Sequence, residues 1–377
     1  MNNSNVNTAK ILHIISSGTV GGAERCFLEM LEASKTLGYD TAAVCAGGGE
    51  LQKLASDVCG RVYTAPMADN ADLISLYKLY RIITEYKPDL CHLHMNRATL
   101  LGALAARFAG VKSLGSIQGE VRPLYAYFPD YLTFCSKSVA EHVRTKSSVV
   151  AARPSFYLYN CVDGAALAKD AADAGGRAFL TKEFGVPEKA FVICQVARLH
   201  PNKGHIFLID AVRENIERIP SLYCLIVGGG DKKYEDGLRK AAADRRISDR
   251  VIFTGTRLDV AKILGAADLF VLPSLQEGIP MTIMEALSLK VPVAVFDVGG
   301  IRELCEGCGD AQSRIEFVAP RDTKALAAKI YDMYLNYPRY KAAAEKACEH
   351  IGNRYGKNSY FRDIGAIYKD VMRSKYR

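Results

Sequence analysis

The sequence contains no tryptophan, no long apolar run and no regular cysteine pattern, and the last two absences exclude whole classes of protein. No run approaches about 18 uncharged apolar residues, so no membrane-spanning helix is expected. The polar opening MNNSNVNTAK argues against a secretory signal. We therefore expect the 11 cysteines to be reduced thiols and the protein to be cytoplasmic. The lack of tryptophan excludes nothing by itself.

Motifs for bound metals and dinucleotides are also scarce. The only C-x-x-C, from Cys305 to Cys308, has no second pair or histidine nearby, so we interpret it as a turn rather than a zinc site. The sequence lacks G-x-G-x-x-G, which disfavours an NAD-dependent enzyme, and no D-x-D stands near the site proposed below. We therefore predict neither a cofactor nor a metal.

What the sequence does contain is an ordinary globular composition, 49% hydrophobic and 24% charged, over a length that favours two domains. Short apolar runs alternate with helical patterns, as they do in βαβ units. One series starts with KILHII and a second with FVICQV, and NCVDGAALAKDAADAGGRAF interrupts the alternation between them. We predict an α/β protein of two Rossmann-like, doubly wound parallel-sheet domains facing a central cleft, with ligands at the carboxyl ends of strands.

The stretch PSLQEGIPMTIMEALSLKVPV holds two glutamates on either side of a proline. Pro280 would break a helix that carried both Glu277 and Glu285. We expect a loop with Glu277, a helix that begins near Pro280, and Glu285 on its second turn. The N–H groups and the dipole at such a helix N-terminus attract anions. A capping box from Ser274 to Glu277 is the alternative.

Two cations follow the first strand of the second series. VARLHPNKG places Arg198 and Lys203 between an apolar run and a helix. A guanidinium and an ammonium together suit a diphosphate, although a plain surface loop is the alternative. Carboxylates repel phosphate and accept hydrogen bonds from hydroxyls. The two glutamates therefore fit the two sugars that flank the diphosphate of a sugar nucleotide.

Two further candidates lie in the first series. SSGTVGGAER puts Gly21 and Gly22 between a strand and a helix, where backbone can approach a phosphate or form a tight turn. DLCHLH places His92 and His94 on one face of a strand. We do not interpret this pair as the start of a metal site. We expect a catalytic or hydroxyl-binding role for His94, whereas His92 fits a packed, hydrogen-bonded imidazole equally well.

The order of GGAER, VARLHPNKG and the E-x7-E of EGIPMTIME resembles the retaining glycosyltransferases of family four, which have the GT-B fold. NCVD resembles the N-G-V-D segment of that family, with Cys161 in place of glycine, and FDVGGIREL resembles a later glycine loop. The resemblance covers roughly residues 10–370. It implies an acceptor-side domain over residues 1–166, a donor-binding domain over residues 167–356, and a helix over residues 357–377 that packs back on the first domain.

The resemblance also implies the activity: metal-independent transfer of a hexose or N-acetylhexosamine from a nucleotide-diphosphate sugar to a glycan or glycolipid. A UDP-sugar is favoured over GDP- and ADP-sugars, and the pathway would be polysaccharide or lipopolysaccharide assembly. Glu277 and His94 would be catalytic, and Glu285 would bind the ribose. The diphosphate would be bound by Arg198, Lys203, Gly21 and Gly22. The loop around the donor sugar and phosphate would comprise Gly278, Ile279, Pro280, Met281 and Thr282.

The acceptor side is less well specified. Gln118 stands where many members of the family have a histidine, so a non-catalytic sugar-nucleotide sensor is an alternative. EVRPLYAYFPDYLTF brings Arg122 together with Tyr125 and Tyr127, whose rings suit a sugar, a lipid headgroup boundary or a protein core. Residues 335–377 carry ten Lys/Arg against four Asp/Glu. We predict peripheral contact with the anionic inner membrane and no nucleic acid, the solvated face of terminal helices being the alternative.

Overall fold

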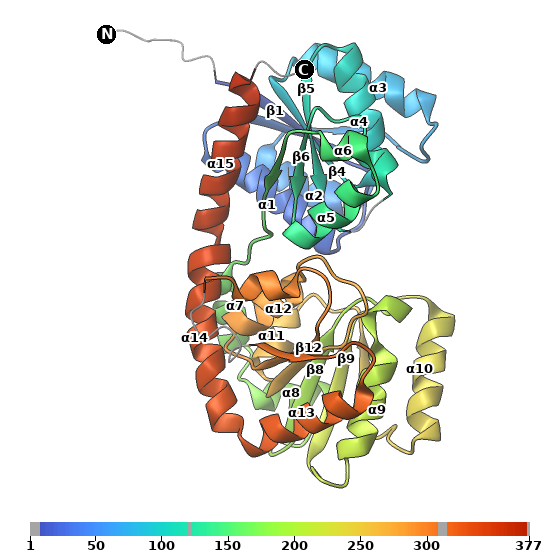
Figure 1. Cartoon of the computed structure of the whole chain (residues 1–377), viewed down its shortest axis with the longest axis vertical. Helices are drawn as coiled ribbons and strands as arrows, with labels where there is room; N and C mark the ends of the chain where they lie inside the picture. Colours follow the sequence, from blue (N-terminus) through green and yellow to red (C-terminus); the bar gives the residue numbers. More distant parts are fainter. Residues whose placement is uncertain (1–7, 120–121, 308–314, 375–377) are drawn as a thin grey trace. The chain divides into compact units, whose positions relative to one another are not determined.

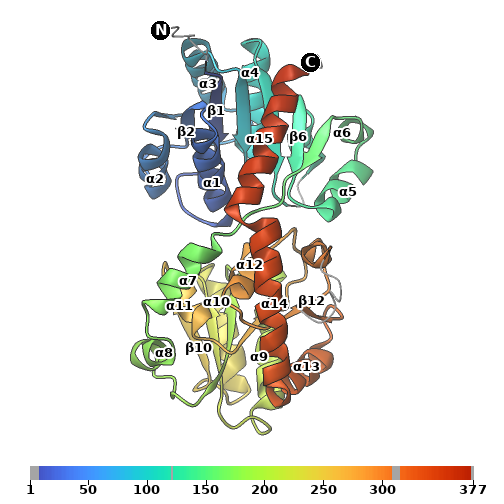
Figure 2. The ribbon, with the colours of Figure 1, turned by 90° about the vertical axis from the view of Figure 1, so that its left-hand side faces the viewer.

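The computed structural model describes residues 8–119, 122–307 and 315–374, and the chain forms two compact units (Figures 1 and 2). Unit 1 comprises residues 1–161 and 357–377, and unit 2 comprises residues 162–356. The division thus falls after Cys161, whereas the sequence-based boundary was residue 166. Among the described residues, no helix is long and apolar enough to cross a bilayer.

Unit 1 is built on a seven-stranded parallel sheet with the order β3-β2-β1-β4-β5-β6-β7. The order reverses beside β1, whose neighbours are β2 and β4, as in a doubly wound fold. The strands are β1 Lys10–Ile15, β2 Asp40–Cys45, β3 Val62–Thr64, β4 Leu90–His94, β5 Lys112–Ile117, β6 Tyr131–Phe134 and β7 Ser155–Tyr157.

Helices cover both faces of this sheet, so its central strands β1, β4 and β5 are buried along nearly their whole length. One face packs against α1 and α15 through Met30, Ile364 and Tyr368. The other packs against α3 and α4 through Leu79 and Ala98, among others. The helices of unit 1 are α1 Gly22–Thr36, α2 Glu50–Cys59, α3 Leu73–Tyr86, α4 Asn96–Phe108, the 3-10 helix η1 Pro123–Ala126, α5 Lys137–Thr145, α6 Ser148–Ala151 and α15 Lys357–Arg373.

Unit 2 repeats the plan with a six-stranded parallel sheet of order β10-β9-β8-β11-β12-β13. Its strands are β8 Phe191–Val196, β9 Leu222–Val227, β10 Val251–Gly255, β11 Leu269–Leu272, β12 Val293–Phe296 and β13 Ile315–Val318. The helical elements are α7 Gly164–Ala172, α8 Arg177–Phe184, η2 Pro201–Lys203, α9 His205–Asn215, α10 Lys232–Asp244, α11 Val260–Gly265, α12 Met281–Ser288, η3 Ile301–Cys305, α13 Thr323–Leu335 and α14 Tyr337–Tyr355. The two doubly wound sheets confirm the predicted fold class.

The small and acidic stretch between the two series is helical in the structure. Asp163 caps α7 by accepting a hydrogen bond from the Ala166 N–H at 3.0 Å, and the alanines that follow have the highest helix propensity. The division between the units falls inside this stretch, after Cys161. The helix α7 that follows contributes no buried residue.

The basic C-terminal segment is also helical, and it is divided between the units. α14 belongs to unit 2 and α15 to unit 1. Figure 2 shows α15 running along unit 1 beside α1 and β6. Lys112 Nζ donates to the carbonyl oxygens of Val371 and Met372 at 3.1 and 3.0 Å, which places a cation at the negative end of the α15 dipole.

Candidate functional site

In unit 2 the candidate loops meet where the strand order reverses. β8 lies between β9 and β11, so successive crossovers leave it in opposite directions. Such a point opens a crevice at the carboxyl ends of the strands. Arg198 and Lys203 follow β8, and Glu277 follows β11. The topology thus brings the two sequence candidates to the same edge of one sheet.

The loops after β8 and β11 are fastened to each other. Gly204 has a φ of +67°, and a Cβ at this position would lie 1.8 Å from the Pro273 carbonyl oxygen, so only glycine fits. The Leu275 N–H donates to the Asn202 carbonyl at 2.8 Å. The Asn202 side-chain amide donates to Gln276 Oε1 at 3.1 Å. The two loops therefore form a single surface.

Lys203 and Glu277 form an ion pair across this surface, with 2.7 Å between Nζ and Oε1. The Glu277 side chain is 7% exposed and that of Lys203 is 26% exposed. A carboxylate this buried requires a partner. The lysine backbone is fixed as well, because Gln195 Nε2 donates to its carbonyl oxygen at 2.7 Å. We expected two separate ligand contacts here, and the structure shows that the two residues also contact each other.

The glycine loop after β12 lies against the same place. A Cβ on Gly299, whose φ is +57°, would lie 1.8 Å from the Glu277 carbonyl oxygen. The Gly300 N–H donates to the Gly278 carbonyl at 3.0 Å. The absence of a side chain at Gly299 therefore allows the backbone of Glu277 and Gly278 to pack directly against the loop after β12. In the sequence this loop was indicated only by the resemblance of FDVGGIREL to the later glycine loop of the family.

Helix α12 starts where the proline predicts. Pro280 is its N-cap residue, the helix spans Met281–Ser288, and Glu285 lies on the second turn with 6% of its surface exposed. The capping-box alternative is wrong, because Ser274 is fully buried ahead of the loop and no helix begins there. No side chain caps α12, and its first turn carries no acidic residue. Its N-terminus thus keeps the polarity that favours an anion.

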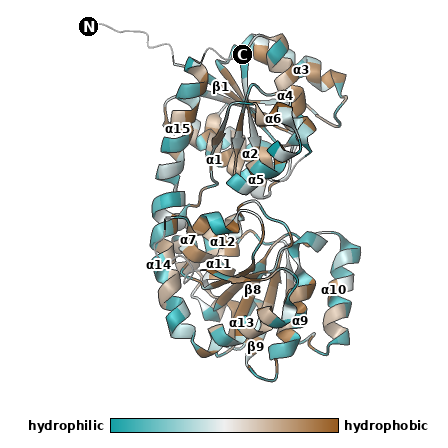
Figure 3. Ribbon diagram, viewed as in Figure 1, coloured by the Kyte–Doolittle hydropathy of each residue, from teal (hydrophilic) through white to brown (hydrophobic). Residues whose placement is uncertain are grey.

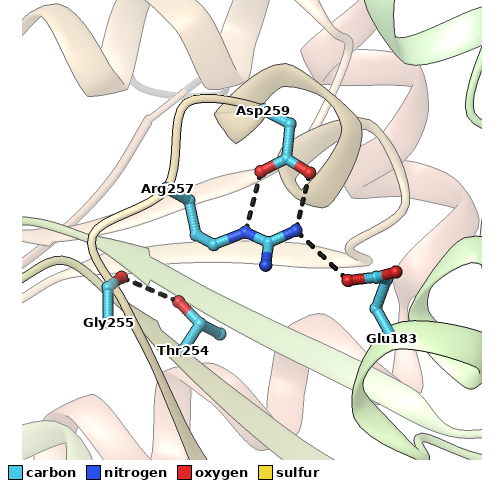
Figure 4. Close-up of polar contacts among 5 residues, drawn as sticks. All are labelled: Glu183, Thr254, Gly255, Arg257 and Asp259. Carbon is cyan, nitrogen blue, oxygen red and sulfur yellow. Dashed lines mark hydrogen bonds and ion pairs between the residues drawn. The ribbon is translucent and has the colours of Figure 1, made fainter.

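Two more loops complete this edge, and the sequence analysis missed both. After β9, a Cβ on Gly228 would lie 2.0 Å from the Ala197 carbonyl oxygen, directly before the exposed Arg198. After β10, Arg257 holds Asp259 with two hydrogen bonds of 2.8 and 2.7 Å and contacts Glu183 at 3.3 Å (Figure 4). The GGG triplet that follows β9 was the available signal, since three glycines allow close backbone contact.

In unit 1, the predicted residues lie at the carboxyl ends of β1, β4 and β5. Gly21 and Gly22 are exposed at the start of α1, which has no side-chain cap. His94 and Gln118 both line a cavity of about 320 Å³. The cavity is bounded by Ser16, Ala23, Cys26, His94, Met95, Asn96, Arg97, Ser116, Ile117, Gln118 and Gly119.

Behind this cavity, His13 joins the two predicted histidines. It pairs in register with His92 on the adjacent strand, and ligand atoms of His13, His92 and His94 lie within 4.8 Å of one another. His13 completes a cluster that we did not expect, because it is distant in sequence. His92 is held by two hydroxyls, Tyr368 at Nδ1 and Ser116 at Nε2, both at 2.8 Å. Of the two alternatives for His92, the structure therefore shows the packed, hydrogen-bonded imidazole.

Hydrogen-bond partners assign the proton positions in this cluster. Ser34 Oγ lies 2.8 Å from the Met30 carbonyl and 3.4 Å from the Tyr368 hydroxyl, so its single hydrogen goes to the nearer acceptor or to Tyr368, and in either case Ser34 accepts from His13 Nε2 at 2.9 Å. Neutral His13 then presents Nδ1 as an acceptor, and His94 Nε2 donates to it at 3.2 Å. The unprotonated nitrogen of His94 is consequently Nδ1, a hydrogen-bond acceptor for a hydroxyl.

Burial keeps the three imidazoles neutral. It lowers the pKa of His13 from 6.5 to about 3. The pKa values of His92 and His94 are also well below 6.5, first because of burial and then because of neighbouring imidazoles. Neutral imidazoles can also bind a metal, but both nitrogens of His13 and His92 already have hydrogen-bond partners within the protein.

The aromatic residues of EVRPLYAYFPDYLTF, which include Phe128 and Tyr131 besides the candidates Tyr125 and Tyr127, divide into surface and core. Tyr131 is 2% exposed and belongs to the core beside α15, and Phe128 packs on the α3–α4 core. Tyr125 is half-buried, and its hydroxyl accepts from Asn70 Nδ2 at 3.2 Å. Tyr127 packs on the α5 core, while Arg122 is exposed. Only part of this segment is thus available to a ligand.

Comparison with known families agrees with the two-unit architecture. The family described as Glycosyltransferase Family 4 matches residues 20–165, and the family described as Glycosyl transferases group 1 matches residues 190–336. The chain belongs to the family 4 glycosyltransferases. Its two parallel-sheet units are those of the GT-B fold.

Individual relatives of this glycosyltransferase are distant. An Escherichia coli UDP-Gal:alpha-D-GlcNAc-diphosphoundecaprenol alpha-1,3-galactosyltransferase is 28% identical over 317 residues, which are 77% of this chain and 80% of that protein. The Rhizobium meliloti lipopolysaccharide core biosynthesis mannosyltransferase LpsB is 28% identical over 50% of this chain and 53% of its own. The structure of Anabaena HepE in complex with UDP-glucose superposes with a TM-score of 0.82 at 22% identity, covering 96% of this chain and 99% of that one.

Proposed function

We propose that this glycosyltransferase retains anomeric configuration, needs no metal, and transfers a sugar from a UDP-sugar to a lipid-linked glycan at the cytoplasmic face of the inner membrane. The observation that carries the proposal is the joined surface in unit 2, where Lys203, Glu277 and the α12 N-terminus meet at the reversal of strand order. The choice of donor and acceptor is suggested by the names of two relatives. The Escherichia coli galactosyltransferase is named for UDP-Gal and a diphosphoundecaprenol-linked sugar, and the HepE structure is a complex with UDP-glucose.

The donor roles follow from charge and position. Arg198 and Lys203 bind the diphosphate, and the α12 N-terminus adds its dipole to the same anion. Lys203 has three N–H donors, so one bond to Glu277 leaves two for phosphate oxygens. Glu277, held by that bond, accepts from hydroxyls of the donor sugar. Glu285, one turn into α12, binds the ribose, and the backbone from Gly278 to Thr282 lines the loop.

The chemistry is mainly electrostatic. The bond between the anomeric carbon and the diphosphate oxygen breaks, and the acceptor oxygen forms the new bond on the same face. The acceptor proton passes to an oxygen of the leaving diphosphate. Arg198, Lys203 and the helix N-terminus stabilise the charge that builds on this leaving group, as a divalent ion does in other enzymes. In unit 1, His94 Nδ1 and Gln118 offer hydrogen bonds to acceptor hydroxyls in the cavity, and Gly21 and Gly22 remain predicted phosphate contacts.

The test is a thermal-shift panel of UDP-, GDP- and ADP-sugars, followed by transfer assays in EDTA. A cognate donor stabilises the folded state by mass action, so a UDP-sugar should raise the Tm most. Transfer to a diphospho-lipid-linked sugar should continue in EDTA, and NMR of the product should show the anomeric configuration of the donor. Loss of activity in EDTA that magnesium restores would contradict metal independence, and an inverted product would contradict retention.

A further inference from the structure

Helix α3 is apolar on both of its sides. Its inner side contributes Leu79 and Ile83, both fully buried, to the core of unit 1. Its outer side exposes Leu73 at 74%, Ile74 at 70% and Tyr77 at 60%. Four of the 11 large hydrophobic residues that are exposed in the described chain lie on this one helix, Tyr80 being the fourth. Scattered exposed hydrophobics are ordinary, whereas a contiguous group marks a contact surface.

Cations border this apolar stripe. Leu73, Tyr77 and Tyr80 share one helical face at i, i+4 and i+7. Lys78 and Arg81 lie exposed on its flank, and Arg81 Nη1 donates to the Tyr77 hydroxyl at 3.3 Å. Arg81 also interacts electrostatically with Glu85, one turn further along the same helix. The surface therefore combines aliphatic, tyrosine and basic side chains.

The acidic residues nearest the start of the helix are turned to the backbone. Asp72 caps α3, accepting from the Ser75 N–H at 2.8 Å and from the Ala68 N–H at 3.0 Å. Asp69 accepts from the Ala71 N–H at 2.7 Å. On the helix itself Glu85 is the exposed acid, opposed by Lys78 and Arg81 and by the C-cap Lys87. Three cations, Lys78, Arg81 and Lys87, thus equal in number the three acids, but the carboxylates of Asp69 and Asp72 are engaged at the N-terminal loop, whereas Lys78 and Arg81 are exposed beside Tyr77.

The surface continues toward the acceptor cavity. Asn70, just before α3, donates to the Tyr125 hydroxyl of η1, which also exposes Leu124 at 43%. Arg97 lines the cavity and donates to the Ala68 carbonyl in the loop that leads into α3. Hydrogen bonds therefore connect the loop that precedes α3 both to η1 and to one wall of the cavity.

We propose that the outer side of α3, with Leu124 of η1, docks on an anionic lipid bilayer. In Figure 3, brown and teal segments alternate along α3, as in a helix that lies in a membrane interface. Aliphatic side chains enter the acyl boundary, tyrosines sit at headgroup depth, and Lys78 and Arg81 meet lipid phosphates. Docking would hold the acceptor cavity beside the membrane, and this purpose rests on the proposed lipid-linked acceptor. Binding to the bilayer does not itself depend on transferase activity.

The experiment is flotation of the full chain with phosphatidylglycerol vesicles and with phosphatidylcholine vesicles. We expect flotation with the anionic lipid that salt weakens, because salt screens the headgroup attraction. The variant Leu73→Ser, Ile74→Ser, Tyr77→Ser should bind at least about tenfold more weakly, since it removes the inserted apolar area. The matched control Phe108→Ser, Val149→Ser, Leu335→Ser removes side chains that are 69%, 52% and 59% exposed elsewhere and should float like the wild type.

A second variant, Lys78→Glu with Arg81→Glu, tests the charges without changing the apolar stripe and should lose the preference for anionic lipid. Wild-type protein that fails to float at low salt, or a serine variant that floats like the wild type, would overturn the proposal. A dimer in solution that the serine variant abolishes would instead assign the surface to a second copy. UDP binding, carried by unit 2, should be the same in all variants. A wild type that floats but binds no sugar nucleotide would refute the proposed function and leave the docking surface intact.

Discussion

Replacing Lys203 by alanine leaves Glu277 as a buried carboxylate without its cation. The pair is 2.7 Å apart, and the Glu277 side chain is only 7% exposed. A hydrogen bond to a charged group contributes about 1.5–3 kcal/mol. Because Lys203 is 26% exposed and partly screened by solvent, we expect the free energy of unfolding of unit 2 to fall by about 2 kcal/mol. For a domain of this size that corresponds to a Tm lower by about 4–8 °C.

The effect of the stranded charge can be separated from the loss of the side chain. The double variant Lys203→Ala, Glu277→Gln should recover most of the lost stability, because the buried charge is gone. Lys240→Ala is the matched control: Lys240 pairs with Asp244 at 3.2 Å on the surface, with both side chains more than half exposed, and should change stability by less than about 0.5 kcal/mol. Far-UV circular dichroism is the assay, since the chain has no tryptophan. A wild-type Tm for Lys203→Ala, or no recovery in the double variant, would refute the reasoning.

Three further predictions test the two units separately. Glu285→Ala should weaken UDP binding in calorimetry about tenfold, whereas Glu277→Ala should leave it unchanged or tighter while turnover falls; identical profiles would contradict one glutamate per sugar. Gly299→Ala should destabilise unit 2 by more than about 2 kcal/mol, because its Cβ meets the Glu277 carbonyl, while Gly185→Ala, with a φ of +69° in open space, should show only the smaller dihedral effect. The pKa of His13 is lowered to about 3, so the unfolded chain takes up the proton first and stability falls as pH drops below about 6.5. Urea titrations of His13→Gln should show a shallower fall, by up to about 1.4 kcal/mol per pH unit, and an unchanged slope would exclude His13 as its source.

The sequence by itself determined the features that depend on neighbouring residues. Apolar runs that alternate with helical periods predicted both parallel sheets, because strands that helices cover on both faces are mostly apolar. Pro280 predicted the start of α12 and the position of Glu285, because proline fixes φ and lacks the N–H that a helix interior needs. The ordered motifs indicated the family without any tertiary information. The predicted roles of Arg198, Glu285, Gly21 and Gly22 remain predictions.

Only the tertiary structure decided which distant groups meet. Lys203 pairs with Glu277, and His13 joins His92 and His94, because the strand order places β8 beside β11 and β1 beside β4. No local pattern encodes that order. The outer side of α3 was not predicted for a related reason: apolar side chains lie on more than one face of this helix, so the sequence does not reveal which face the core covers. Packing of α3 against α4 covered one face, and Leu73, Ile74 and Tyr77 were left on the other.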